Sequence, residues 1–139
     1  MNIKLNRQKR NSSKDKNLTR DNHLSIAFLA AKIAEEKKGE NILLLDVSKL
    51  TVLSDCFLIV TAKSMPQINA IAKSIEENLR SANCRLISKE GFVDSNWVVL
   101  DFGNLIVHIM NEKERSYYKL EKFWSNAIVI DNKIWEKAS

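Results

Sequence analysis

The chain has 139 residues, of which 45% are hydrophobic and 28% charged, a composition typical of one soluble globular domain. No apolar run approaches the roughly 18 residues that a membrane-spanning helix needs, and the chain is too short for the two lobes of a protein kinase. Its three glycines also exclude the glycine-rich turns that bind phosphate in P-loop and dinucleotide-binding proteins.

The formal charge of +5 is concentrated at the start of the chain. Residues 1–20 hold seven basic side chains and one acidic one, a balance of +6, which leaves −1 for the other 119 residues. This leader has few apolar residues and no helical periodicity, which predicts a disordered segment. Three roles stay open for it: an electrostatic arm that binds RNA, a solvated tail, or a short organelle transit peptide.

The two cysteines, Cys56 and Cys84, lie far apart and form no CxxC motif. Neither a zinc site nor a catalytic thiol is therefore expected. The basic leader runs into no apolar segment of the secretory type, so we expect both thiols to be reduced and the protein to be cytoplasmic.

A first helix is predicted over residues 21–38, where apolar residues recur at helical spacing and Gly39 follows as a stop signal. Two short apolar runs come next, at residues 42–45 and 56–61. Both are typical of strands that are covered on both faces.

A second helix is predicted to begin after Ser64. Ser64 and Gln67 form a capping box, in which each side chain binds a free amide of the first turn, and Pro66 stands where a missing N–H costs least. The apolar residues that follow recur at helical spacing and predict a helix that packs on the sheet: Ile68, Ile71, Ala72, Ile75 and Leu79.

Three more strands are predicted, at residues 85–90, 97–101 and 105–110. Between the last two stands the triplet Asp-Phe-Gly, with which protein kinases hold magnesium. The chain has none of the other kinase motifs, so we do not expect Asp101 to be a magnesium ligand. Two strands joined by so short a segment predict a hairpin, in which Gly103 supplies the positive φ of the turn.

A last helix is predicted from Asn111, where an N-x-x-E capping box precedes an aromatic-rich stretch, and residues 127–130 could add a further strand. The chain is thus predicted to contain a single α/β domain of the α+β type, with a mixed five-stranded sheet packed with helices. We divide it into a basic leader at residues 1–20, this domain at residues 21–130 and a C-terminal tail at residues 131–139.

Few side chains suggest catalysis. His108 and Asp101 lie across the predicted hairpin and could form a general-base pair, but one such pair is a weak argument for an active site. Asp46 and Asp55 each flank a strand and could bind a metal ion as in nucleotide-transferring enzymes, although strand-end caps are the commoner role. We expect no cofactor and no bound metal.

Aromatic side chains gather in the last third of the chain. A small domain needs some of them for its core, and this is the role predicted for Trp124. Tyrosine and tryptophan also dominate protein interfaces, and Trp97 and Tyr118 are predicted to serve there.

Five stretches of the chain follow one another in a specific order: DVSKLTVLSDCFLIVTAKS, QINAIAKSIEE, EG, WVVLDFGNLIVHIM and the pattern R-x-x-Y-x-L-E-x-x-W from Arg115 to Trp124. In this order and spacing they resemble the ribosomal silencing factor family, also called Iojap-related. The likeness covers residues 24–130. It implies a compact domain related in topology to nucleotidyltransferases but without their active site.

By the same resemblance, the protein is expected to bind the large-subunit ribosomal protein uL14, to block joining of the two ribosomal subunits and so to repress translation when nutrients are scarce. It is not expected to be an enzyme. The family's partner-facing signature falls here on Trp97, Asp101, His108, Arg115, Tyr118, Glu121 and Trp124.

The chain departs from the family pattern at two places. Members usually carry Gly-Thr-Ser and Arg-Gln before the central helix, where this chain has residues 62–64 as Ala-Lys-Ser and residues 66–67 as Pro-Gln. The aspartate usual after the hairpin triplet is Asn104 here. If that charge pairs with a basic partner residue, its loss would cost about 0 to 1 kcal/mol.

Two other functions stay open as alternatives. One is a divergent magnesium-dependent nucleotidyltransferase that uses Asp46, Asp55 or Asp101. The other is an RNA-binding module that uses the basic leader, which could also contact ribosomal RNA as part of the family function. The sequence decides neither for nor against a homodimer.

Overall fold

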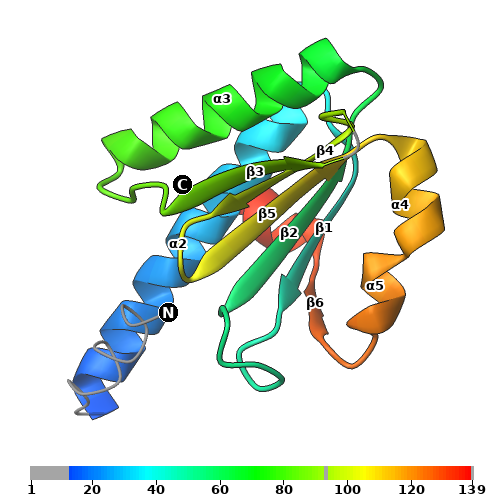
Figure 1. Ribbon diagram of the computed structural model, residues 1–139. Helices are drawn as coiled ribbons and strands as arrows, with labels where there is room; N and C mark the ends of the chain where they lie inside the picture. Colours follow the sequence, from blue (N-terminus) through cyan, green and yellow to red (C-terminus); the bar gives the residue numbers. More distant parts are fainter. Residues whose placement is uncertain (1–12, 93, 139) are drawn as a thin grey trace.

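The structure, a computed structural model, describes residues 13–92 and 94–138. Its centre is a six-stranded sheet with the strand order β3-β4-β5-β2-β1-β6 (Figure 1). The β2–β5 pair is parallel and the other four pairs are antiparallel, so the predicted mixed sheet is confirmed. The strands are β1 (Glu40–Asp46), β2 (Cys56–Thr61), β3 (Ser88–Phe92), β4 (Trp97–Asp101), β5 (Leu105–Met110) and β6 (Ile128–Ile130).

The count of five predicted strands was one too low. The sixth strand, β6, lies where the sequence left a further strand open, and it pairs with the outer edge of β1. Strand β3 also begins at Ser88 rather than at residue 85. The preceding residues form an irregular connection from the helix before it, in which Asn83 has a φ of 62°.

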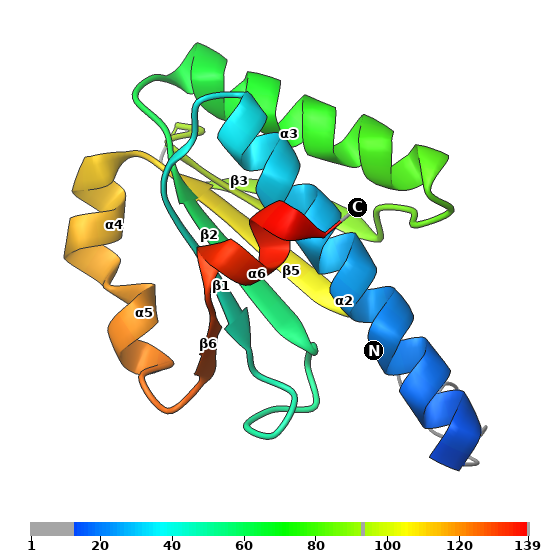
Figure 2. The same ribbon diagram turned by 180° about the vertical axis from the view of Figure 1, so that it is seen from behind.

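The helices lie on the two faces of the sheet. Figures 1 and 2 show α2 and α3 across one face, with α6 packed beside α2, whereas α4 and α5 lie by the other face. The buried residues follow the same division into a large cluster under α2, α3 and α6 and a smaller one under α4 and α5. The helices are α2 (Ser13–Glu36), α3 (Met65–Ser81), α4 (Glu112–Tyr118), α5 (Leu120–Phe123) and α6 (Asn132–Lys137).

Helix α3 begins as the sequence predicts. The Ser64 hydroxyl accepts a hydrogen bond from the Gln67 N–H at 3.2 Å, and all five predicted apolar residues of the helix are buried. The Gln67 side chain reaches further than in a simple capping box. It accepts from the Lys63 N–H at 2.6 Å and donates to the Lys38 carbonyl at 2.9 Å, which ties the start of α3 to the segment after α2.

Gly39 follows α2, but it is not the residue with a left-handed backbone. That residue is Lys38, with a φ of 68°. A Cβ on Gly39 would lie 2.6 Å from Val60 Cγ1 and 2.9 Å from the Ala34 carbonyl oxygen. Glycine is needed here because the chain passes directly over β2 as it enters β1.

The ends of the described chain differ from the predicted division. Helix α2 begins at Ser13, inside the predicted leader, because extending a helix that is already nucleated by packed residues costs little. Residues 1–12 lie outside the described residues, so their predicted disorder stays a prediction. At the other end, α6 buries Trp135 in the larger core to 2% exposure, so residues 132–137 pack as part of the fold instead of forming a tail.

Candidate partner-binding surface

The hairpin between β4 and β5 forms one side of the candidate surface. The Asp101 Oδ1 atom accepts a hydrogen bond from the Gly103 N–H at 2.7 Å, and Gly103 has a φ of 91°. The Phe102 N–H donates a hydrogen bond to the Leu105 carbonyl oxygen at 2.9 Å, which joins the two strands next to the turn. The Asp-Phe-Gly triplet is therefore a turn, as predicted, and the Asp101 carboxylate stabilises that turn.

The aromatic-rich stretch after β5 forms two short helices instead of the single one predicted. The Asn111 side chain caps α4 by accepting from the Glu114 N–H at 2.8 Å, as the capping box predicts. Lys119 then takes a left-handed backbone, with φ 50° and ψ 52°, which ends α4 and starts α5 in a new direction. This change of direction lets Leu120 and Trp124 pack on the smaller core.

Seven rings form a continuous series of contacts over this face of the sheet, and we call them the aromatic chain. Neighbouring ring centroids in it lie 4.8 to 6.0 Å apart. Such distances are favourable for offset and edge-to-face packing. In contact order the chain is Tyr117, Tyr118, Trp97, His108, Phe57, Trp124 and Phe123.

The two ends of the aromatic chain are exposed and its middle is not. Tyr117 and Phe123 are 78% and 79% exposed, and Tyr118 is 46% exposed. Trp97 and Trp124 are half-buried, while Phe57 lies in the core beneath them. The buried rings therefore support exposed rings that have no cover within the described part of the chain.

His108 is the middle ring of the aromatic chain, between Trp97 and Phe57. Its Nδ1 atom accepts a hydrogen bond from the Trp97 indole N–H at 3.1 Å. Burial lowers the pKa of His108 from 6.5 to about 4, because water no longer solvates the charged form. The imidazole is therefore neutral near pH 7, and its bond goes to Trp97 rather than to Asp101 as the general-base alternative requires.

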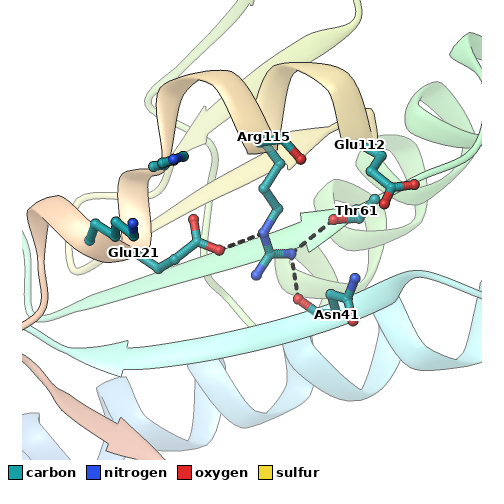
Figure 3. Close-up of a pocket in the computed structure, with 8 residues that line it drawn as sticks. Asn41, Thr61, Glu112, Arg115 and Glu121 are labelled. Carbon is teal, nitrogen blue, oxygen red and sulfur yellow. Dashed lines mark hydrogen bonds and ion pairs between the residues drawn. The ribbon is translucent and has the colours of Figure 1, made fainter.

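Arg115 and Glu121, both in the predicted partner-facing set, are bonded within the protein (Figure 3). The Arg115 Nε atom donates to Glu121 Oε2 at 3.0 Å, and Nη1 donates to Thr61 Oγ1 at 2.9 Å and to the Asn41 carbonyl oxygen. The Arg115 side chain is only 11% exposed. We call these four residues the Arg115 bracket.

The structure thus sorts the seven predicted residues. Trp97, His108, Tyr118 and Trp124 share the aromatic chain, Asp101 caps the adjacent turn, and Arg115 and Glu121 form the bracket beside it. Phe57 is not in the predicted set, because its apolar run predicts only a buried strand. Tyr117 and Phe123, the two most exposed rings of the aromatic chain, also lie outside the predicted set, although each is the sequence neighbour of a predicted residue.

Two of the carboxylates considered for metal chemistry, those of Asp46 and Asp101, accept hydrogen bonds within the protein. Asp46 Oδ1 accepts from the Ser48 N–H at 3.0 Å and from the Ser48 hydroxyl at 2.6 Å, which is the strand-end cap that the sequence favours. Asp55 is bonded through its backbone to Val47 and Asn104. Within residues 13–92 and 94–138, no three His, Cys, Asp or Glu side chains are grouped to hold a metal ion. Nor is any helix in this range long and apolar enough to span a membrane.

Comparison with known proteins gives consistent results. The family model described as "Ribosomal silencing factor during starvation" matches residues 20–139. The chain is 37% identical over 110 residues to the ribosomal silencing factor RsfS of Bacillus subtilis (strain 168), which covers 79% of this chain and 93% of that protein. It is 36% identical over 108 residues to the chloroplastic protein Iojap of Zea mays, which covers 78% and 47% of the two chains.

Solved structures give the same result. A crystal structure of a Chromobacterium violaceum protein superposes with a TM-score of 0.69 at 36% sequence identity, covering 72% of this chain and 83% of the other. One from Bacillus halodurans superposes with a TM-score of 0.64 at 30% identity, covering 78% and 95%. Because the family model matches residues 20–139, which is most of this chain, the chain belongs to the ribosomal silencing factor family.

Proposed function

We propose that the protein is a non-catalytic translation repressor that binds the large ribosomal subunit through ribosomal protein uL14 and blocks joining of the small subunit under nutrient limitation. Family membership supports the ribosome as target, and the aromatic chain is the observation that supports a protein as the direct partner. The proposal includes a cytoplasmic location, where ribosomes are found.

The aromatic chain has the properties of an interface centre. Tyrosine and tryptophan contribute most of the binding energy in many protein interfaces, because they bury a large area with few rotatable bonds. Here Tyr118 and Trp97 are in contact at 4.8 Å and are held by a buried layer, so they lose little freedom on binding. The partner contact is proposed for these two rings, Trp124, Tyr117 and Phe123.

Repression then needs no chemistry. A protein that occupies the joining face excludes the other subunit from the same space, so the degree of inhibition follows the fraction of large subunits that carry it. This differs from the nucleotidyltransferase alternative, which requires magnesium and a nucleoside triphosphate.

Gradient sedimentation with purified subunits tests the proposal. We expect the protein to co-sediment with large subunits and not with small ones, and a molar excess to prevent formation of joined ribosomes. Joined ribosomes that form normally in the presence of excess protein would refute it. Saturable binding of a magnesium–nucleotide complex to the pure protein would instead favour the nucleotidyltransferase alternative.

We propose a second contact, between the basic leader and ribosomal RNA. The leader holds the positive charge of the chain, and most of it precedes the region that the family model matches. Each phosphate contact that releases a counterion steepens the dependence of log Kd on log salt by about 0.7 to 0.9. This predicts that large-subunit binding by the parent protein weakens steeply as the salt concentration rises.

Charge replacement tests this contact. Changing Lys4, Arg7, Lys9 and Arg10 to Gln should lower the salt dependence of large-subunit binding by about 2 to 4 units of slope. The control changes four exposed lysines of the domain to Gln and so alters the net charge equally: Lys73, Lys89, Lys133 and Lys137. Equal slopes for the two variants would mean that the leader makes no specific contact.

A further inference from the structure

We infer that Arg115 is a positioning residue: it fixes α4 and α5 on the sheet and so holds Tyr118 and Trp124 in place for the partner, without touching the partner itself. The inference rests on the proposed function for its binding consequence. Its structural part concerns the free protein and can be tested separately.

The Arg115 bracket joins four secondary-structure elements, two of which lie more than 50 residues before Arg115 in the sequence. Arg115 lies in α4 and Glu121 in α5, while Thr61 ends β2 and Asn41 lies near the start of β1. Asn41 stands between Glu40 and Leu43, where the pairing of β1 with β2 is interrupted, and its φ is 47°. Its carbonyl oxygen accepts from Arg115 at this interruption.

The two helices need such a bracket because they are short. Helix α4 has seven residues and α5 has four, and helices of this length are not stable without tertiary contacts. On the apolar side, α5 and the residue after it are held by Leu120 and Trp124. On the polar side, the described contacts that tie α4 to the strands are those of Arg115 with Thr61 and Asn41.

Burial makes the guanidinium dependent on these partners. A charged group at 11% exposure must be paired, and Glu121 supplies the opposite charge at 3.0 Å. The fork of Arg115 binds three acceptors that lie on different segments, which a lysine cannot do with the same geometry. Three of its N–H groups are committed inside the protein, which argues against a direct ion pair with a partner.

An open pocket of about 460 Å³ lies beside the bracket (Figure 3). Its charges are mixed, since three cations and two carboxylates line it, so neither an anion nor a cation is strongly favoured there. We interpret the pocket as the space between α4–α5 and the sheet that the bracket spans. Its lining residues are Asn41, Thr61, Glu112, Arg115, Ser116, Lys119, Glu121 and Lys122.

Thr61 offers a clean test because it is only 4% exposed and bonds to Arg115. Thr61→Val keeps the shape of the side chain and removes the acceptor. If Arg115 acts by positioning, Thr61→Val should weaken large-subunit binding about three- to tenfold, and it should weaken binding no further in an Arg115→Ala background. Parent-like binding by Thr61→Val, or effects that multiply in the double variant, would overturn the inference.

The free protein gives a second readout. Nuclear Overhauser contacts between the rings of Trp97 and Tyr118 should be weakened in Thr61→Val and in Arg115→Ala. They should be unchanged in Arg80→Ala, which removes the same group from an exposed pair on α3. Retained ring contacts in both bracket variants would overturn the inference.

The two proposals can fail separately. If Arg115→Ala does not fold, Arg115→Lys replaces it, and thermal unfolding of each variant identifies general destabilisation. Should the parent protein fail to bind large subunits, the proposed function is wrong, and the ring contacts alone decide whether Arg115 positions α4.

Discussion

Three polar side chains at the candidate surface bond to other groups of the same protein. The Trp97 N–H bonds to His108, the Asp101 carboxylate bonds to the Gly103 N–H, and Arg115 bonds to three acceptors around it. Beside these bonded groups, the exposed rings of Tyr117, Tyr118 and Phe123 offer a partner their faces and edges. The energy of docking should therefore come from apolar burial, with a smaller contribution from charge.

Replacing one exposed ring should weaken binding and leave the fold intact. Tyr118→Ala removes a 46%-exposed ring that rests on Trp97, and we expect a loss of about 1 to 3 kcal/mol in large-subunit binding. Met65→Ala is the control, since Met65 is similarly exposed at 43% but begins α3 on the opposite face of the sheet. Unchanged co-sedimentation of Tyr118→Ala would place the interface elsewhere.

The stability of the protein should fall on mild acidification because of His108. Its pKa is about 4 in the folded protein and 6.5 as the ordinary value, so between these pH values the unfolded chain binds a proton that the folded protein does not. Stability is therefore fully present above pH 6.5 and declines as the pH falls toward 4. The expected loss by pH 5 is about 2 kcal/mol.

Urea unfolding at pH 7.5 and pH 5 measures this effect. His108→Gln cannot titrate, so it should lose less stability than the parent protein over the same interval. If the two proteins lose the same amount, other groups cause the pH dependence.

Contacts near in sequence were predictable at the residue scale, and distant ones were not. The turn chemistry of Asp101 and Gly103 and the caps at Ser64 and Asn111 follow from local spacing alone. The Arg115 bracket depends on Thr61 and Asn41, more than 50 residues earlier in the chain. No local pattern marks those two residues as acceptors, so the sequence could not show that the Arg115 guanidinium bonds within the fold.

At the scale of elements, the existence of helices and strands was easier to predict than their ends. The apolar period of α3 identified every buried residue of that helix. The stretch after Asn111 is predicted as one helix because a capping box opens it and its side chains Tyr117, Leu120, Glu121 and Trp124 fall on one helical stripe. Packing of Leu120 and Trp124 on the sheet requires the chain to turn at Lys119, and this tertiary requirement is not visible in helix propensity.

The junction of α2 and β1 gives a prediction at this scale. Gly39→Ala would bring a methyl group within 3 Å of Val60 Cγ1 and of the Ala34 carbonyl, so we expect a loss of about 1 to 3 kcal/mol in the free energy of unfolding. Gly91→Ala is the matched control, because the nearest atom to its added Cβ would be Ser95 Oγ at 3.4 Å. Thermal unfolding of the two variants makes the comparison, and equal stability would contradict the close approach at Gly39.

At the scale of the whole molecule, the last described helix packs against the first described helix. Helix α6 packs beside α2 over the same face of the sheet (Figure 2), and its Trp135 belongs to the larger core. The sequence predicts a tail at residues 131–139, because six helical residues with one apolar turn give no clear period. The contact with α2, more than 90 residues away, helps to give this segment its place in the fold.

Trp135→Ala should therefore destabilise the protein by about 3 to 5 kcal/mol, as expected for loss of a buried tryptophan. Ile134→Ala changes the neighbouring residue, which is 55% exposed, and should cost about 0.5 kcal/mol or less. Denaturant unfolding of both variants tests this. Similar denaturant midpoints for Trp135→Ala and Ile134→Ala would show that α6 does not contribute to the core.

The parallel pair β2–β5 at the centre of the sheet has a kinetic consequence. It joins Cys56 to Leu105 and Thr61 to Met110, so this pairing forms only after a long intervening loop has closed. Domains dominated by such distant pairings reach the native state more slowly than helical bundles of similar size. We expect the rate-limiting barrier to include this closure, so that changes in β2 or β5 slow refolding, whereas changes in the peripheral β6 mainly accelerate unfolding.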